Sequence, residues 1–281
     1  MTSPDVPKVK PFLKWVGSKR RLVPDLLARM PKAFGAYHEP FVGGGSLFWT
    51  ISATSPGPFH LSDMNSYLVA TYRAVRDHVE PLISLLREMP YEKTFYYAQR
   101  DRQRTGQIAA LDDVQIGAWF IYMNRAGFNG LWRVNQSGQC NNPFGRYTNP
   151  TICDAENLRA CSSVLSKVDT RIRHIDFSAA VADVEPGDLV YFDPPYIPLS
   201  DTSDFTGYTE DGFDHEDQLR LRDCALKLKS RGVHVVLSNS DTPVTRKIYD
   251  SPLFTLESVM AARSINSDGA KRQKISELII S

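Results

Sequence analysis

The sequence lacks the features that mark several classes of protein. Its four cysteines show no C-x-x-C spacing and its six histidines no H-E-x-x-H pattern, which argues against a disulfide framework or a structural zinc site. No apolar run approaches the ~20 residues that a membrane span needs, and the N-terminus lacks the apolar core of a signal peptide. We therefore expect a cytoplasmic protein with reduced thiols, without a metal and without a membrane partner.

Charge is segregated along the chain, although the formal net charge is only +1. Residues 8–32 hold eight Lys or Arg against one acid, and residues 120–150 hold three arginines and no acid. Residues 176–217 hold twelve acids and no Lys or Arg. A solvated face explains any one block, but together they indicate that the basic blocks bind a polyanion and the acidic block meets a group that is not a phosphate.

A short motif, Asp193-Pro194-Pro195-Tyr196, follows the apolar run Leu189–Phe192. The run predicts a buried strand, and the prolines end its ladder because they cannot donate a backbone hydrogen bond. The carboxyl end of a strand is where open α/β sheets bind ligands. There, a carboxylate and a rigid carbonyl can accept both N–H groups of an exocyclic amine, while the tyrosine ring stacks on the base. The alternative is an ordinary Asp-Pro turn.

A glycine turn, Gly43-Gly44-Gly45, lies between a predicted strand at 37–42 and a predicted helix at 46–52. Strand, glycine turn and helix open a nucleotide-binding unit, and the absence of a G-K-[ST] motif favours a nucleoside without phosphates. Asp63 ends a second predicted strand, Phe59–Ser62, about twenty positions later, where an acid can accept both ribose hydroxyls. Alternatively, Asp63 is the N-cap of the helix that begins near Asn65.

The remaining segments alternate between helices and strands, which predicts a doubly wound α/β sheet. Helices are expected at 21–30, 66–104 (with breaks at Pro81 and Pro90), 113–124, 155–168 and 214–230. Strands are expected at 171–175, at 233–237 and twice near the C-terminus. Residues 200–212 are expected to form a loop that either closes over a bound base or is an ordinary surface loop, and the tail is basic at 263–266 and 271–274.

Residues 126–147 differ in composition from the predicted helices before them. They are rich in Asn, Arg and aromatic residues, carry no acid, and turn at a Ser-Gly pair. This pattern predicts a β-hairpin, suited to insertion into a DNA groove with an arginine reading guanine and an aromatic wedge filling a vacated stack. A surface loop is the alternative.

With these motifs assembled, the sequence resembles the Dam family of DNA adenine-N6 methyltransferases, of the α-ordered, D12-type class. Residues 39–46 are similar to the family's S-adenosyl-L-methionine (AdoMet) loop, residues 62–65 match its ribose-binding acid, and residues 193–196 match its catalytic tetrad. The resemblance implies AdoMet as methyl donor, S-adenosyl-L-homocysteine as product, and Asp193, Pro194, Pro195 and Tyr196 as catalytic residues. The cofactor contacts it implies are Trp15, Lys19, Glu39, Phe41, Gly43, Gly45, Asp63, Asp176, Phe177 and Asp193.

The hairpin shares this resemblance and implies a 5′-GATC-3′ target. Carried over, Lys14 and Arg133 read guanines, Leu131 and Pro143 pack on a thymine methyl, and Asn129 fills space beside a flipped adenine. The full implied DNA-binding set is Lys14, Asn124, Arg125, Phe128, Asn129, Leu131, Arg133, Pro143, Arg146 and Tyr147. Phe128 departs from the family, because Dam itself has a tyrosine there; the change keeps stacking and loses any contact of the phenol oxygen.

The expected architecture is a Rossmann-like catalytic domain of residues 1–70 and 165–281 with an inserted helical and hairpin target recognition domain, 71–164. The expected partner is double-stranded DNA, bound by a monomer or weak dimer associated with the nucleoid, alone or beside a cognate restriction endonuclease. Asp193 favours adenine over cytosine N4, since enzymes of the latter kind usually carry serine there. The alternatives are an AdoMet-binding DNA-binding regulator without turnover, and a methyltransferase for a non-DNA amine or amide.

Overall fold

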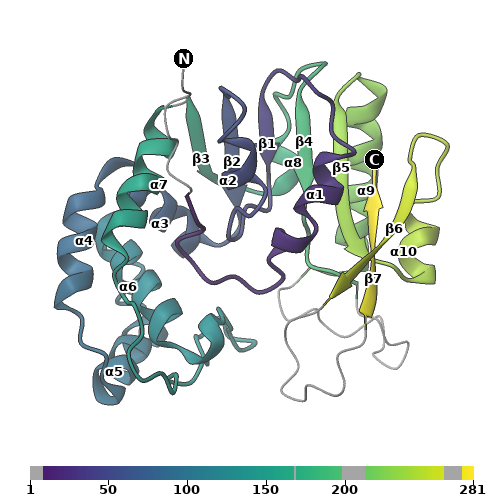
Figure 1. Cartoon of the computed structure of the whole chain (residues 1–281). Helices are drawn as coiled ribbons and strands as arrows, with labels where there is room; N and C mark the ends of the chain where they lie inside the picture. Colours follow the sequence, from purple (N-terminus) through teal and green to yellow (C-terminus); the bar gives the residue numbers. More distant parts are fainter. Residues whose placement is uncertain (1–8, 168, 198–212, 263–273) are drawn as a thin grey trace. The chain divides into compact units, whose positions relative to one another are not determined.

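The computed structural model of the protein describes residues 9–167, 169–197, 213–262 and 274–281 (Figure 1). A seven-stranded sheet has the order β3-β2-β1-β4-β5-β7-β6. The strands are β1 (Tyr37–Glu39), β2 (Phe59–Asp63), β3 (Thr170–His174), β4 (Leu189–Phe192), β5 (His234–Ser240), β6 (Leu256–Ala262) and β7 (Lys274–Ile280). The predicted doubly wound α/β sheet is confirmed.

Strand direction defines where this sheet can bind a ligand. β1 pairs in parallel with both β2 and β4, and β4 pairs in parallel with β5. β7 runs antiparallel to β5 and to β6. The strand order reverses between β1 and β4, so the carboxyl ends of these two strands form the topological switch point at which α/β sheets hold ligands. Asp193 directly follows β4.

Contacts divide the chain into two compact units. The first comprises Met1–Ser18, Gly43–Gly57 and Asp63–His174, and the second comprises Lys19–Val42, Pro58–Ser62 and Ile175–Ser281. The segment 71–164, expected to recognise the target, lies within the first unit. In the described part of the chain, no helix has the length and apolar character required to cross a membrane.

The first unit is built around one buried helix. Its helices are α2 (Phe48–Ile51), α3 (Ser66–Asp77), α4 (Val79–Glu88), α5 (Lys93–Arg104), α6 (Asp113–Ala126), η2 (Phe128–Gly130) and α7 (Ala155–Lys167). α6 contacts both α3 and α4, and it buries the large aromatic side chains Trp119, Phe120 and Tyr122. Each such side chain contributes about 1.5–3 kcal/mol through burial. Asp112 begins α6 by accepting a hydrogen bond from the backbone of Gln115.

The second unit packs its helices on the central strands. They are η1 (Lys19–Arg21), α1 (Val23–Leu27), α8 (Phe177–Ala180), α9 (His215–Ser230) and α10 (Pro243–Ile248). All four residues of β4 are buried, and Phe192 shares one apolar core with Leu221 of α9 and Leu237 of β5. α9 begins with a reciprocal capping box between Asp214 and Asp217. This core makes β4 a rigid base for the residues that follow it.

Several predicted boundaries need correction. The helix expected at 21–30 is limited to η1 and α1, the strand expected at 37–42 ends at Glu39, and the helix expected at 46–52 covers only α2. The break expected at Pro81 falls at His78, because Pro81 occupies the first turn of α4, where its missing N–H costs nothing. The strand expected at 233–237 continues to Ser240, and α10 was not predicted. Residues 200–212 and the tail residues 263–266 and 271–273 lie outside the described residues.

Candidate active site

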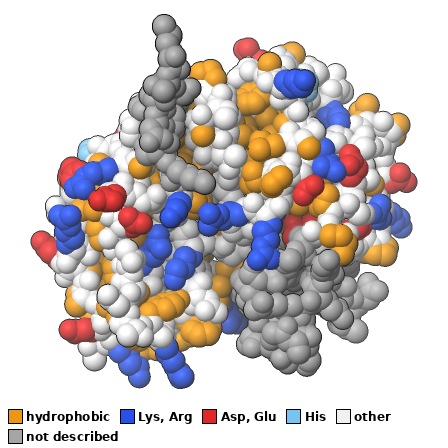
Figure 2. Space-filling view, in the orientation of Figure 1, with side chains coloured by type: hydrophobic (Ala, Val, Ile, Leu, Met, Phe, Trp, Pro, Cys, Tyr) orange, Lys and Arg blue, Asp and Glu red, His pale blue; other side chains and the backbone are white. Residues whose placement is uncertain are grey.

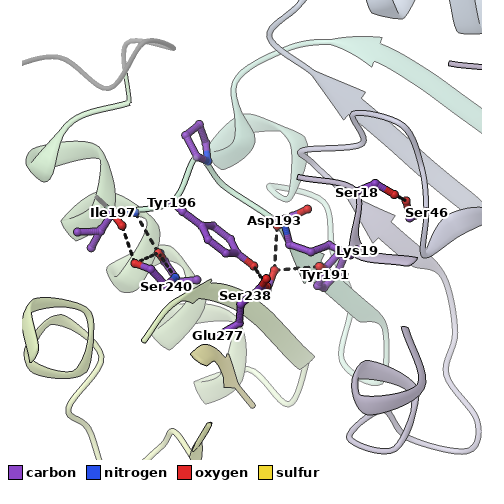
Figure 3. Close-up of polar contacts among 12 residues, drawn as sticks. Ser18, Lys19, Ser46, Tyr191, Asp193, Tyr196, Ile197, Ser238, Ser240 and Glu277 are labelled. Atoms are coloured by element: carbon purple, nitrogen blue, oxygen red, sulfur yellow. Dashed lines mark hydrogen bonds and ion pairs between the residues drawn. The ribbon is translucent and has the colours of Figure 1, made fainter. Parts of the chain in front are cut away.

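Asp193 is held at one oxygen by two donors in the second unit. Lys19 Nζ lies 2.9 Å from Asp193 Oδ1, and Ser238 Oγ donates to the same oxygen at 2.9 Å (Figure 3). The side chains are 10% exposed for Lys19 and 21% for Asp193. Burial raises the pKa of the Asp193 carboxyl, and the lysine and serine contacts oppose that rise. Among the described residues Oδ2 has no hydrogen-bond donor, so one oxygen is fixed and the other can accept.

Tyr191 supports Ser238 from within the sheet. Its Oη lies 2.9 Å from Ser238 Oγ. Because Ser238 gives its own proton to Asp193, Tyr191 must be the donor in this pair. Burial raises the pKa of Tyr191 well above its usual value, which keeps it protonated. Sequence reasoning missed Ser238, since the predicted strand stopped one residue before it.

Tyr196 is fixed both at its hydroxyl group and over its ring. Tyr196 Oη donates to Glu277 Oε2 of β7 at 2.9 Å, and Lys19 Nζ lies 4.2 Å from the ring centroid. Figure 3 shows Tyr196, Lys19 and Asp193 around Ser238. Burial, with Asp193 and Glu277 nearby, raises the Tyr196 pKa well above its usual value. The phenol is therefore a neutral donor to Glu277, another residue that sequence reasoning missed.

The two proline carbonyls of the tetrad differ in their environment. The Pro195 carbonyl accepts a hydrogen bond from Gln218 Nε2 of α9 at 2.9 Å. No side chain of the described residues donates to the Pro194 carbonyl. Of the two, the Pro194 carbonyl is thus the one free to accept a hydrogen bond from a ligand.

The other expected cofactor residues of the second unit form an aromatic group and two acidic positions. Phe41 stacks on Phe177 with centroids 5.5 Å apart, and Phe213 meets the two rings at 5.6 and 5.8 Å. Glu39 is buried and accepts from Tyr37 Oη at 2.8 Å. Phe213 was absent from the predicted set, and it directly follows the undescribed loop.

Asp176 is the N-cap of α8 and accepts from the backbone N–H of Ser178 at 3.0 Å. Arg220 Nη2 lies 3.2 Å from its Oδ1. Burial acts to raise the Asp176 pKa, but the Ser178 and Arg220 contacts outweigh it, and the net pKa is lowered. Asp176 is therefore an ionised acceptor at neutral pH.

The glycine turn in the first unit has a backbone that other residues adopt only with strain. Gly43 has φ +46° and Gly45 has φ +66°, and a Cβ on Gly43 would lie 2.6 Å from Trp15 Nε1. Asp63 Oδ2 accepts from the Gly43 N–H at 3.1 Å, and its Oδ1 accepts from the Asn65 N–H at 2.9 Å. Asn65 itself caps α3, so the alternative of Asp63 as that N-cap is wrong. The Asp63 carboxylate is partly exposed and lies beside a turn of glycines, which carry no side chains. The Trp15 indole lies against the same turn. This arrangement fits a ribose and an amino-acid moiety.

The expected hairpin pairs its two arms without regular strands. Isolated antiparallel bridges join Gly127 to Phe144 and Val134 to Cys140, so the antiparallel pairing is confirmed. The first arm begins with the 3-10 turn η2 instead of a strand, and within it Asn129 has φ +55°. The arms therefore meet as loops and not as a strand ladder.

Most expected DNA-binding residues are accessible, and one, Asn124, is buried. Figure 2 shows Lys and Arg side chains on the exposed face of the first unit. The exposed members of the set are Lys14, Phe128, Asn129, Arg133, Pro143 and Arg146, while Leu131 and Tyr147 are half-buried. Asn124 is buried, and its amide bonds the backbone of Lys14 and Gly130. Arg125 donates to the Phe12 carbonyl at 2.7 Å, and burial lowers its pKa.

A doubly wound sheet that carries a glycine turn after β1, an acid at the end of β2 and an Asp-Pro-Pro-Tyr motif after β4 defines an AdoMet-dependent methyltransferase. The family described as D12 class N6 adenine-specific DNA methyltransferase matches residues 15–265, and the chain belongs to it. It is thus an adenine-specific DNA methyltransferase that uses AdoMet and double-stranded DNA.

Curated relatives cover nearly the whole chain. Type II methyltransferase M1.LlaDCHI of Lactococcus lactis subsp. cremoris is 43% identical over 97% of this chain and 95% of its own length. Type II methyltransferase M.MjaIII of Methanocaldococcus jannaschii is 39% identical over 97% and 99%. The DNA adenine methylase of Escherichia coli strain K12 is 35% identical over 97% and 95%. The expected family resemblance is confirmed.

Proposed function

We propose that the protein methylates N6 of an adenine that is flipped out of double-stranded DNA, within 5′-GATC-3′. The observation that carries the chemistry is the state of Asp193, whose Oδ1 is fixed by Lys19 and Ser238 while Oδ2 remains able to accept. An exocyclic amine is a poor nucleophile because its lone pair is delocalised into the ring. Acceptors for both N–H bonds draw the nitrogen toward tetrahedral geometry and localise that lone pair.

The tetrad residues have separate roles in this proposal. Asp193 Oδ2 accepts one N6–H bond, the Pro194 carbonyl accepts the other, and Tyr196 stacks on the base. Flipping costs a few kcal/mol, and stacking on one aromatic ring offsets about 1–3 kcal/mol of it. AdoMet supplies the electrophilic methyl group. Alignment by the protein is the main catalytic contribution, since positioning can lower a barrier by about 7–11 kcal/mol.

We assign the cofactor contacts within each unit. In the first, Asp63 binds the ribose hydroxyls and Trp15 lies with Gly43 and Gly45 against the methionine part. In the second, Asp176 and Phe177 contact the adenine of AdoMet, with Glu39 and Phe41 behind them and Lys19 beside Asp193. The stacking of Phe41 on Phe177 supports the adenine assignment.

Target reading is assigned to the exposed hairpin residues of segment 71–164, the recognition domain, together with Lys14. Lys14 and Arg133 read guanines, Leu131 and Pro143 contact a thymine methyl, and Asn129 lies beside the vacated stack. For the buried Asn124 and the half-buried Arg125 we propose an indirect role: Asn124 holds the backbone of Lys14 and the 3-10 turn, and Arg125 holds the backbone at Phe12. We further propose that the protein acts as a monomer or weak dimer, either beside a cognate restriction endonuclease or alone.

Tritium transfer from labelled AdoMet tests the proposal. The duplexes contain GATC, GATC with both adenines methylated, GAATTC, or a scrambled site, and wild type is compared with Asp193→Ala and the exposed control Asp183→Ala. Label on GATC alone, absent with Asp193→Ala and kept with Asp183→Ala, is the expected result. Label on another sequence removes the target assignment and keeps the chemistry. AdoMet binding without transfer to any DNA would favour the regulator or the non-DNA substrate.

A further inference from the structure

Gln218 lies outside every sequence motif, yet it contacts the tetrad backbone. It sits on α9, is 2% exposed, and its Nε2 donates to the Pro195 carbonyl at 2.9 Å. Its Oε1 accepts from Asn239 Nδ2 at 3.1 Å and from Tyr249 Oη at 3.5 Å. Because the amide oxygen is committed to these donors, the NH₂ group is the one that faces Pro195.

Residues at the end of β5 also hydrogen-bond the backbone next to the tetrad. Asn239 Oδ1 accepts from the Ile197 N–H at 3.2 Å, and Ser240 Oγ donates to the Ile197 carbonyl at 2.6 Å (Figure 3). Three backbone atoms on the two neighbours of Tyr196 are therefore fixed by one neutral, buried network. A satisfied network of this kind holds a backbone rigidly.

We infer that Gln218 is a positioning residue for methyl transfer. The inference rests on the proposed function and adds a determinant to it. By tying back the Pro195 carbonyl, Gln218 leaves the Pro194 carbonyl as the acceptor next to Asp193, and it sets the direction in which Tyr196 leaves the tetrad. Gln218 touches neither the substrate nor the cofactor, so its loss should slow the chemical step and leave binding intact.

Gln218→Met tests this, because methionine has a similar length and no N–H donor. We expect the single-turnover rate constant for methyl transfer to GATC duplex to fall about 10²-fold, the penalty of a misplacement of ~1 Å. The dissociation constants for AdoMet and for DNA should stay at the wild-type values. Leu228→Ala is the matched control, since Leu228 is another buried residue of α9 and lies ten positions beyond Gln218. It should lower the melting temperature and keep the wild-type rate constant.

Gln218→Glu supplies a readout that a merely structural role would not move. A protonated glutamic acid can donate to the Pro195 carbonyl, whereas its carboxylate repels it. The rate of this variant should therefore recover as the pH is lowered, relative to wild type at each pH. Of the described titratable groups, Tyr249 contacts the Gln218 amide, and burial raises its pKa, so it stays neutral throughout. Arg222 lies near Tyr249.

The outcomes separate this inference from the proposed function. A wild-type rate with Gln218→Met, while Asp193→Ala is inactive, overturns the inference and keeps the function. Equal rate losses with Gln218→Met and Leu228→Ala, or no pH recovery with Gln218→Glu, also overturn it by showing a structural role. A wild-type rate with Asp193→Ala removes the proposed function itself.

Discussion

Replacing Lys19 by methionine should convert Asp193 into a buried carboxyl group without its counter-ion. The ammonium lies 2.9 Å from Asp193 Oδ1, and burial already raises the pKa of this carboxyl. A hydrogen bond to a charged group contributes about 1.5–3 kcal/mol. We expect the Asp193 pKa to rise further in Lys19→Met, because the lysine contact that opposes the effect of burial is removed.

The sign of the resulting stability change follows from proton linkage. A carboxyl whose folded-state pKa exceeds its unfolded-state value binds its proton more tightly when folded. Its contribution to stability is full at low pH and is lost as the pH rises through the folded-state pKa. Lys19→Met should therefore be less stable than wild type by about 1.5–3 kcal/mol near neutral pH, and this difference should shrink as the pH falls.

Urea unfolding followed by tryptophan fluorescence measures this difference between about pH 5 and about pH 8. Asp193→Asn and the double variant complete a double-mutant cycle, in which Asp193→Asn should restore most of the stability that Lys19→Met loses. Single-turnover transfer by Lys19→Met should also decline toward acidic pH. A pH-independent stability difference, or zero coupling between the two substitutions, would refute the reasoning.

Three further predictions concern other features of the structure. Gly43→Ala places a Cβ 2.6 Å from Trp15 Nε1, whereas at Gly138, also at positive φ, a Cβ meets nothing within 4 Å. By calorimetry, Gly43→Ala should weaken AdoMet binding at least about tenfold, while Gly138→Ala should cost only about 1–2 kcal/mol of stability. Equal AdoMet affinities of the two variants would contradict this prediction. Gln103 hydrogen-bonds two backbone groups of the hairpin, and an unsatisfied buried group costs about 1–3 kcal/mol. Gln103→Leu should therefore reduce the binding preference for GATC over scrambled duplex, measured by fluorescence anisotropy, and leave AdoMet binding unchanged. An unchanged preference would count against this role of Gln103. Asn129 has φ +55°, so Asn129→Gly should keep or raise the melting temperature, and Asn129→Val should lower the stability by about 1–2 kcal/mol. A valine variant more stable than the glycine variant would show that the backbone is not strained at this position.

Local sequence signals predicted the elements on which the site depends. β4 has the predicted bounds because four apolar residues lie between a turn and two prolines, and each of these signals acts within a few positions. The end of β2 at Asp63 was predictable for the same reason. The capping residues of α9 are adjacent to it in sequence, and its predicted start was accurate to one residue.

The partners of the tetrad could not be predicted, since they come from distant parts of the chain. Ser238 is 45 positions from Asp193, Glu277 is 81 positions from Tyr196, and Gln218 is 23 positions from Pro195. The first two contacts exist because β4, β5 and β7 are neighbours in the sheet, and the third because α9 packs against β5. The amino-acid composition does not encode the strand order. A Ser, Glu or Gln that contacts the tetrad therefore cannot be distinguished by residue type from other polar residues.

The hairpin shows how side chains can replace a strand ladder. The Ser-Gly turn and the flanking residues predicted strands, but Asn142 Nδ2 bonds the carbonyls of Phe128 and Leu131 at 3.3 and 2.9 Å. Those carbonyls would otherwise pair across a regular sheet. A buried amide thus allows the 3-10 turn that carries Asn129, and residue composition cannot anticipate it.

Neutral and charged groups have different roles around Asp193. Gln218, Asn239 and Ser240 fix the tetrad backbone with amides and a hydroxyl, which cost far less to bury than ions do. Lys19 is the cation in contact with the tetrad among the described residues, and it acts on the Asp193 carboxylate and the Tyr196 ring. A change of pH can therefore alter the charge of Asp193 without loosening the backbone that presents it, and loss of the amide network should slow transfer at every pH. Lys19→Met and Gln218→Met should for this reason differ in the shape of their pH profiles as well as in their rates.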